Sequence, residues 1–271
     1  LPIETEALYM IIDFHAHLFP DSLAFRTIPH LQRICGLPPT SDGTRDTLLA
    51  RMGQGGVDLA VVQHIATKPH QQQTINDFAA SLQGEKLRCF GTVHPDSPEP
   101  EKEVERIHRL GLKGVKLHPD YQGFFADDPK ADPIYEACRA LGLPVLFHAG
   151  WDYISPEVSH GSPKAIAAVL DRFPGLTIIA AHLGGMARCK EAEEYLIGRP
   201  VYIDTSMAWN FASPEEAKRI LLHHDPQRIL YGSDCPWGSL EKDRPYLEAL
   251  GLPEDLMEKI WFKNALALLG E

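Results

Sequence analysis

Two histidines separated by one residue, His15 and His17 in the stretch IDFHAHL, are the first residues whose types and spacing predict chemistry. The apolar residues before them predict a buried strand, and side chains two positions apart on a strand point to the same face. Two neutral imidazoles on one face can bind one divalent ion, such as zinc. Because such pairs also arise by chance, the interpretation depends on further ligands elsewhere in the chain.

Further candidate ligands follow other predicted strands at the corresponding position. Acids occur at the ends of two late strands, Asp204 in YIDTS and Asp234 in YGSDCPW. More than half of the 13 histidines end a predicted strand: His15, His17, His64, His94, His118, His148 and His182. A catalytic metal site needs about three protein ligands and an open position. We therefore predict a metal site formed by His15, His17, His148 and Asp234.

The elements that must position these residues are short β-branched segments alternating with longer amphipathic ones. This alternation predicts βα units and a parallel sheet. Eight predicted strands lie at residues 10–15, 58–64, 87–94, 114–118, 144–148, 176–182, 201–206 and 228–234. Their number and the chain length predict an α/β fold, a single-domain (β/α)8 TIM barrel over residues 10–271, in which the strand ends meet at one mouth. An open doubly wound sheet is the alternative, but the first βα turn lacks a glycine-rich fingerprint.

Composition limits the partners and the compartment. With 26 basic and 37 acidic residues the net charge is −11, which argues against nucleic acid and anionic membranes and favours a small-molecule substrate. The sequence shows no transmembrane segment or signal peptide, and its five cysteines form no CxxC pair, so we expect a cytoplasmic protein with reduced thiols. Residues 1–9 are interpreted as an N-terminal extension or cloning remnant. A homo-oligomer is compatible with the sequence, but no feature of it demonstrates one.

One long segment, residues 19–41, is rich in proline and apolar residues and is predicted to be irregular. Loops of this length are usually functional or disordered. We consider two interpretations, a lid over the site and a surface excursion that packs on the barrel.

Five motifs in order, FHAH, GVKLHP, FHAG, AHLGG and GSDCPW, resemble those of the amidohydrolase superfamily. The resemblance is greatest to the amidohydrolase-related branch that includes aminocarboxymuconate semialdehyde decarboxylase, and it spans almost the whole chain. It implies a (β/α)8 barrel that binds one or two divalent metals. By this resemblance His15, His17, His148 and Asp234 are the ligands, and His182 is an acid/base residue or a ligand to a second ion.

Roles for other residues follow from position and chemistry. Asp234 can act as ligand and general base together. Lys116 and His118 share one face of a strand, and two interpretations are open. Lys116 can be a carboxylated bridge to a second ion, as in binuclear members of the superfamily, or it can bind a substrate carboxylate, which we favour. Aromatic residues after the late strands, Trp151, Trp209 and Trp237, are candidates for the pocket wall.

The leading hypothesis is a metal-dependent hydrolase of a small amide, ester or lactone that carries a carboxylate. One zinc ion is the expected cofactor, with manganese or a second ion as alternatives, and it would activate a water molecule. A metal-dependent non-oxidative decarboxylase is the alternative function. Only Arg26 and Arg188 lie on the predicted mouth side as guanidinium partners for a dicarboxylate, which mildly favours hydrolysis. An inactive binding barrel is a third hypothesis, and the complete ligand set argues against it.

Overall fold

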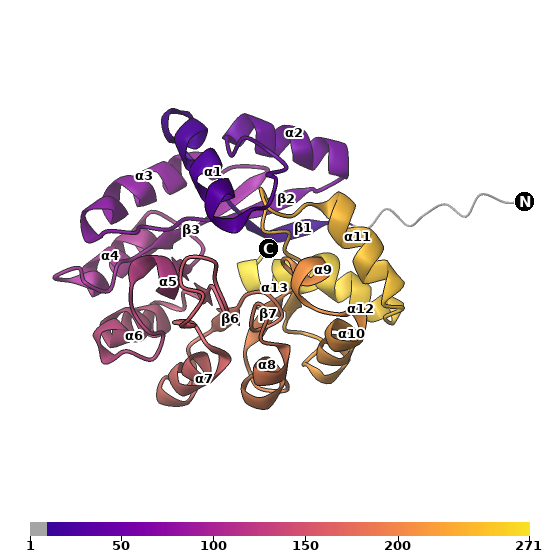
Figure 1. Cartoon of the computed structure of the whole chain (residues 1–271). Helices are drawn as coiled ribbons and strands as arrows, with labels where there is room; N and C mark the ends of the chain where they lie inside the picture. The colour runs from indigo at the N-terminus through magenta and orange to yellow at the C-terminus, as the bar shows by residue number, and fades with distance from the viewer. Residues whose placement is uncertain (1–9) are drawn as a thin grey trace, which may run out of the picture.

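The computed structural model describes residues 10–271, so the predicted extension at residues 1–9 lies outside the described residues. Eight parallel strands follow one another around a nearly closed barrel in chain order (Figure 1). This confirms the predicted single-domain (β/α)8 TIM barrel. The strands are β1 (Ile12–Ala16), β2 (Leu59–Gln63), β3 (Leu87–Thr92), β4 (Val115–Leu117), β5 (Val145–Phe147), β6 (Ile178–Ala180), β7 (Tyr202–Asp204) and β8 (Ile229–Leu230).

Helices surround the strands and alternate with them along the chain (Figure 1). They are α1 (Asp21–Cys35), α2 (Arg45–Gly55), α3 (Gln72–Leu82), α4 (Pro100–Arg109), α5 (Pro119–Gln122), α6 (Asp132–Leu141), α7 (Pro163–Arg172), α8 (Cys189–Tyr195), α9 (Ala208–Phe211), α10 (Pro214–His223), α11 (Leu240–Ala249), α12 (Glu254–Glu258) and α13 (Asn264–Leu269). Short 3₁₀ turns lie at Pro69–Gln71 and Pro129–Ala131, and a π-helical turn lies at Lys259–Lys263. None of the helices within residues 10–271 combines the length and apolar character needed to cross a membrane.

The helix boundaries follow from local sequence. The start of α10 is a capping box: the Ser213 hydroxyl accepts from the Glu216 backbone N–H at 3.3 Å, and the Glu216 carboxylate accepts from the Ser213 backbone N–H at 3.1 Å. At the end of α6, Gly142 adopts φ 67°, a left-handed conformation that glycine adopts without strain. These caps fix where the helices meet the strand ends.

The barrel interior away from the mouth is lined by apolar side chains. Strand residues alternate between the barrel interior and the helix layer, and nearly all of them are buried, as expected for a parallel sheet covered by helices. Within the interior cluster the rings of Phe14 and Phe90 pack edge to face with centroids 5.7 Å apart. Polar side chains are therefore concentrated at the mouth, where the strands end.

Backbone hydrogen bonds join the first strand to the segment after the last one. Phe14 N–H donates to Tyr231 O at 2.8 Å, and two further bonds link the next residues: Asp234 N–H to His15 O at 2.7 Å and His17 N–H to Cys235 O at 2.7 Å. This seam places Asp234 beside His15 and His17, although more than two hundred residues separate them in sequence.

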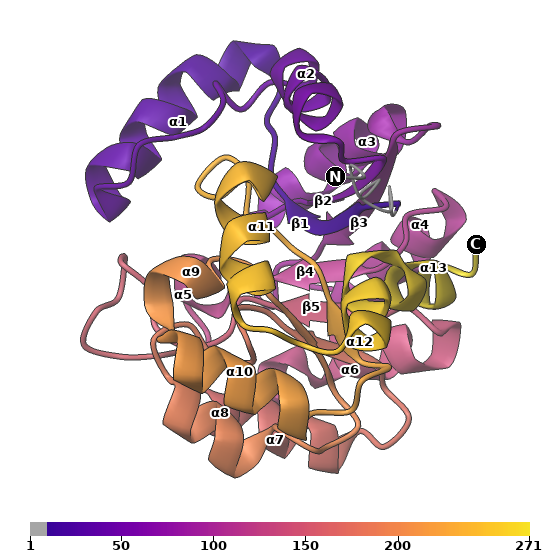
Figure 2. The same ribbon diagram turned by 90° about the vertical axis from the view of Figure 1, so that its right-hand side faces the viewer.

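The segment at residues 19–41 differs from the prediction, because it contains the 15-residue helix α1. Pro29 inside the helix and the small number of buried residues, Ala24 and Ile28, explain why the pattern did not predict a helix. The helix projects from the ring of barrel helices (Figure 2). Its side chains Thr27, Leu31 and Cys35 line the cavity at the mouth, so the segment forms part of the wall of the site.

Candidate metal centre

A cavity of about 190 Å³ opens at the mouth of the barrel. Most of its wall is apolar or aromatic and comes from the loops, α1 and α9; examples are Phe19, Leu31, Ile65, Tyr153, Phe211 and Trp237. Its floor carries the ionisable groups contributed by the strand ends, and these are His15, His17, Lys116, His118, His148, Asp152 and Asp234. The site is therefore a small apolar chamber with a concentrated polar floor.

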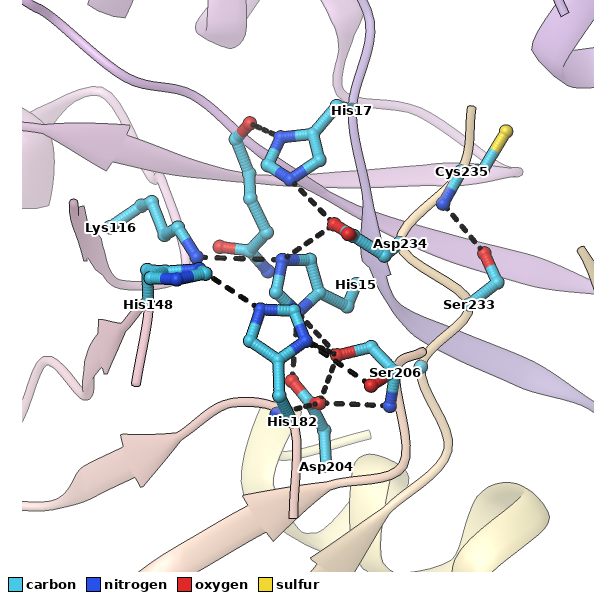
Figure 3. A network of polar contacts seen from close by, with 12 residues as sticks. His15, His17, Lys116, His148, His182, Asp204, Ser206, Ser233, Asp234 and Cys235 are labelled. Atoms are coloured by element: carbon cyan, nitrogen blue, oxygen red, sulfur yellow. Dashed lines mark hydrogen bonds and ion pairs between the residues drawn. The ribbon is translucent and has the colours of Figure 1, made fainter. Parts of the chain in front are cut away.

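Three predicted ligands converge at this floor (Figure 3). Asp234 Oδ1 lies 3.1 Å from His17 Nε2 and 3.4 Å from His15 Nε2. His15 and His17 come from β1 and the residue after it, and Asp234 follows β8 across the seam. His15 and His17 are two residues apart and therefore point the same way, and the closure of the barrel brings Asp234 to them.

The second nitrogen of each imidazole has an acceptor partner that fixes its proton. His17 Nδ1 lies 2.8 Å from the backbone oxygen of Gln63, and His15 Nδ1 lies 2.8 Å from Asp204 Oδ2. A carbonyl or an ionised carboxylate can only accept, so a neutral imidazole in either place carries its proton on Nδ1 and a lone pair on Nε2. The donor set is then two lone pairs and a carboxylate facing each other, which fits a bound divalent cation.

The backbone and hydrogen bonds around Asp234 hold it in place. Asp234 has φ 63°, a left-handed conformation that is costly for a residue other than glycine. The buried carboxylate of Asp13 accepts from the backbone N–H groups of His15 at 3.0 Å and Ser233 at 2.9 Å, and from the Ser233 hydroxyl at 2.5 Å. Ser233 Oγ in turn accepts from Cys235 N–H at 3.0 Å, so both neighbours of Asp234 are tied to this network.

Burial and neighbouring charges shift the pKa values at the floor. Burial raises the pKa of Asp234, but contact with His17 and the charge of His15 lower it by more, so it lies well below its ordinary value. Burial also raises the pKa of Asp204, and the interactions with His15 reverse the shift in the same way. Both groups are therefore carboxylates at neutral pH. Burial lowers the pKa of Lys116 to about 8.

His148 lies in a second group of donor atoms with His118 and Asp152. Asp152 Oδ2 is 3.5 Å from His148 Nε2 and 3.7 Å from His118 Nε2, and the two rings stack with centroids 4.3 Å apart. His118 Nδ1 accepts from the Tyr121 N–H at 3.4 Å, so neutral His118 carries its proton on Nε2 and donates toward Asp152. This group thus fits an ion less well than the first one. Sequence reasoning missed Asp152, which lies in the loop after the strand.

His182 lies behind His148 rather than in the cavity wall (Figure 3). Its Nε2 is 3.0 Å from His148 Nδ1, and burial lowers its pKa to about 3. An acid/base role for His182 stays a prediction, and so does its role as a ligand to a second ion.

The three tryptophans predicted for the pocket wall do not all line the cavity. Trp237 lines the cavity, whereas Trp151 and Trp209 are not among its lining residues. The Trp151 ring packs against Tyr153 with centroids 4.7 Å apart, and Lys242 Nζ lies 4.7 Å from the centre of the Trp209 ring. Tyr153, which also follows β5, lines the cavity.

Lys116 is 1% exposed, and its Nζ lies 3.4 Å from His15 Nε2. Among the described residues that line the cavity it is the sole cationic side chain apart from the histidines. Arg26 and Arg188, the two arginines predicted on the mouth side, are not in that lining. The cavity therefore offers one fixed ammonium group beside the donor set.

Known proteins are similar to this chain over nearly its whole length. The family model described as Amidohydrolase matches residues 12–270. The decarboxylase orsB of Emericella nidulans is 26% identical over 298 residues, covering 88% of this chain and 89% of that protein. The 2-amino-3-carboxymuconate-6-semialdehyde decarboxylase of Dictyostelium discoideum is 24% identical over 280 residues, covering 83% and 76%. The structure of 5-carboxyvanillate decarboxylase LigW from Sphingomonas paucimobilis has a TM-score of 0.74 at 20% identity, covering 97% of this chain and 99% of LigW.

These relatives correct the prediction of function. The leading hypothesis of hydrolysis is wrong, because the curated relatives that match most of the chain are decarboxylases. The reason for the error is chemical: one metal ion held by histidine and aspartate can activate water or polarise a carboxylate-bearing substrate. The ligand motifs therefore indicate a candidate metal site without specifying which bond is broken.

Proposed function

The chain belongs to the amidohydrolase family, and on that premise we propose that it is a metal-dependent, non-oxidative decarboxylase of a small carboxylic acid. The observation that carries this proposal is the pairing, at the floor of an otherwise apolar cavity, of the His15, His17 and Asp234 donor set with the single ammonium group of Lys116. The names of the two curated relatives support the reaction type.

His15, His17 and Asp234 would hold the ion, and His148 would be the fourth ligand. A bound divalent ion supplies a Lewis acid that stabilises negative charge on substrate oxygens. We propose zinc, because nitrogen and carboxylate ligands in a small set suit it.

Lys116 is assigned to hold the substrate carboxylate at the start of the reaction. A buried ammonium group beside an apolar wall forms a stronger pair with an anion than the same group does in water. The carbon–carbon bond to the carboxylate then breaks, CO₂ leaves, and the electron pair stays on the substrate carbon. A proton takes the place of the carboxyl group on that carbon, so charge and atoms balance.

The wall favours a substrate whose carbon can spread that electron pair. Aromatic and aliphatic side chains such as Tyr153, Phe211 and Trp237 suit a flat, conjugated body and exclude water from the reacting carbon. Because the described lining contains no guanidinium group, the second carboxylate of a diacid would have no arginine partner. We therefore propose an aromatic or conjugated acid with a single reacting carboxylate.

The test is a panel of aromatic and conjugated acids incubated with zinc-loaded enzyme. CO₂ release is followed by a coupled assay, and the product is identified by mass spectrometry. We expect at least one acid to give CO₂ and its decarboxylated product in equal amounts, with no turnover by a His15→Ala, His17→Ala double variant. Turnover of amides, esters or lactones without CO₂ release from any acid would refute the proposal.

A further inference from the structure

A chain of buried polar groups runs behind the donor atoms and links Asp204, Ser206, His182 and His148 (Figure 3). Asp204 and Ser206 are both fully buried at the end of β7. They do not line the cavity, so the proposed reaction gives them no contact with a substrate. Their hydrogen bonds nevertheless determine where protons lie on the histidines in front of them.

The two oxygens of Asp204 have different partners. Oδ1 accepts from two backbone N–H groups, His182 at 2.9 Å and Ser206 at 3.0 Å, and from the Ser206 hydroxyl. Oδ2 faces His15 Nδ1 at 2.8 Å. Backbone N–H groups can only donate, so Oδ1 carries no proton, and His15 donates from Nδ1 to Oδ2. The Nε2 atom of His15 is left with its lone pair toward the candidate ion site.

The Ser206 hydroxyl transmits the same constraint to a second histidine. Its single hydrogen is donated to Asp204, so toward His182 Nδ1, 2.9 Å away, its oxygen acts as an acceptor. The Ser206 carbonyl also accepts at 3.2 Å from this nitrogen. Two acceptors therefore place the proton of neutral His182 on Nδ1, and its Nε2 accepts.

His148 is the last residue in this series of hydrogen bonds. Its Nδ1 lies 3.0 Å from the accepting Nε2 of His182, so His148 carries a proton on Nδ1. This leaves Nε2 as the nitrogen of His148 that could bind an ion. In the structure this Nε2 faces two acceptors, Trp151 O at 3.2 Å and Asp152 Oδ2 at 3.5 Å, so a bound cation would replace a proton there.

We infer that Asp204 is a positioning residue that fixes a proton on Nδ1 of His15 directly and on Nδ1 of His148 through Ser206 and His182, so that Nε2 is the nitrogen each histidine offers to the ion. This inference rests on the proposed function only for the role of His148 as a ligand. In this account His182 orients His148 and does not need to contact the substrate.

The substitution Asp204→Asn tests the inference with almost no change in volume. The amide nitrogen cannot replace Oδ1, because it would meet two backbone N–H donors there, so it must face His15 Nδ1. We expect His15 to move its proton to Nε2. His182 and His148 keep theirs on Nδ1, because Ser206 can still donate to the amide oxygen.

Proton positions are read from ¹⁵N spectra of histidine-labelled, metal-free protein at pH 8, assigned with single His→Gln variants. In the unsubstituted protein we expect protons on the Nδ1 atoms of His15, His182 and His148. In Asp204→Asn we expect the proton of His15 on Nε2. An Nε2 proton on His15, or an Nδ1 atom of His148 without a proton, in the unsubstituted protein would overturn the inference, and this result does not depend on whether the variant folds.

Zinc affinity, measured by competition with a chromophoric chelator, gives a second readout. Loss of an orienting partner weakens metal binding by about 10- to 100-fold, and we expect that loss in Asp204→Asn. The matched control is Asp243→Asn, another buried carboxylate, which accepts from the Tyr231 hydroxyl at 3.0 Å; its histidine spectrum and zinc affinity should not change. Affinity within twofold of the unsubstituted protein in Asp204→Asn would contradict the inference. The expected spectra and affinities without decarboxylation of any acid would support it while refuting the proposed function.

Discussion

Substitution of Lys116 is the sharpest test of how the cavity binds its substrate. Lys116→Gln removes the charge and keeps most of the side-chain volume. The ammonium group is 1% exposed, so its pair with a carboxylate is shielded from solvent. A hydrogen bond to a charged group contributes about 1.5–3 kcal/mol, and the buried position favours the upper part of that range. Since about 1.4 kcal/mol is a factor of ten, kcat/KM should fall by about 10- to 150-fold.

The kinetic pattern of this variant separates binding from chemistry. If Lys116 contacts the carboxylate equally in the ground state and the transition state, KM rises and kcat stays nearly constant. The assay is CO₂ release with the acid found in the substrate panel, and bound zinc is measured in every preparation. Lys116→Arg should restore little activity, because its planar guanidinium is wider and the cavity is small.

The matched control is Lys113→Gln. Lys113 precedes β4 and is partly exposed, with its Nζ 3.9 Å from Glu271, so kcat/KM should not change. A Lys116→Gln enzyme with full zinc content and kcat/KM within threefold of the unsubstituted protein would refute the assignment of Lys116 to the carboxylate.

Three further predictions concern the metal centre and stability. His17→Ala removes one of the three converging donors, so the protein should purify with little zinc by elemental analysis; full zinc content would contradict the proposed ligand set. Gly232→Ala would place a Cβ 2.8 Å from the Cβ of His15, and at a typical overpacking cost of about 1–3 kcal/mol we expect zinc affinity to fall by about 5- to 150-fold. Burial raises the pKa of Asp243 well above its ordinary value, so its contribution to stability is present below the unfolded pKa of about 4 and is lost as pH rises through the folded pKa. In urea titrations Asp243→Asn should therefore lose less unfolding free energy between pH 4 and pH 8 than the unsubstituted protein, and equal losses would contradict this account.

Two exposed or unstrained positions serve as controls for these variants. Gly55→Ala adds a Cβ that would lie 3.9 Å from the Leu240 Cβ, an ordinary contact, so zinc affinity should not change. Asp255→Asn alters an exposed carboxylate in α12, 74% of whose side chain is accessible, and serves as the exposed-site control in the urea titrations.

The barrel and half of the metal centre could be predicted from the sequence, because both depend on local periodicity. Alternating short and long apolar segments specify βα units, and the two-residue repeat of a strand places His15 and His17 on one face. The position of Asp234 after the last strand also indicates the mouth, since parallel strands end on one side.

Only the tertiary structure decided which of the strand-end groups meet. The backbone seam between β1 and the segment after β8 brings Asp234 to His15 and His17, whereas His148 lies with His118 and Asp152. Distances across a barrel depend on closure and on loop paths, which no local repeat encodes. The same reason explains why α1, with Pro29 inside it, was expected to be irregular and why Trp237 alone of three tryptophans lines the cavity.

The partners of the buried polar groups were not encoded in a local pattern. Asp204 was identified as a strand-end acid, but only the fold places it against His15, and Ser206 against His182. Sequence determined that imidazoles and carboxylates would gather at one end of a barrel, because periodicity and strand direction are local properties. The structure decided which nitrogen of each imidazole is free, because that depends on contacts between residues far apart in the chain.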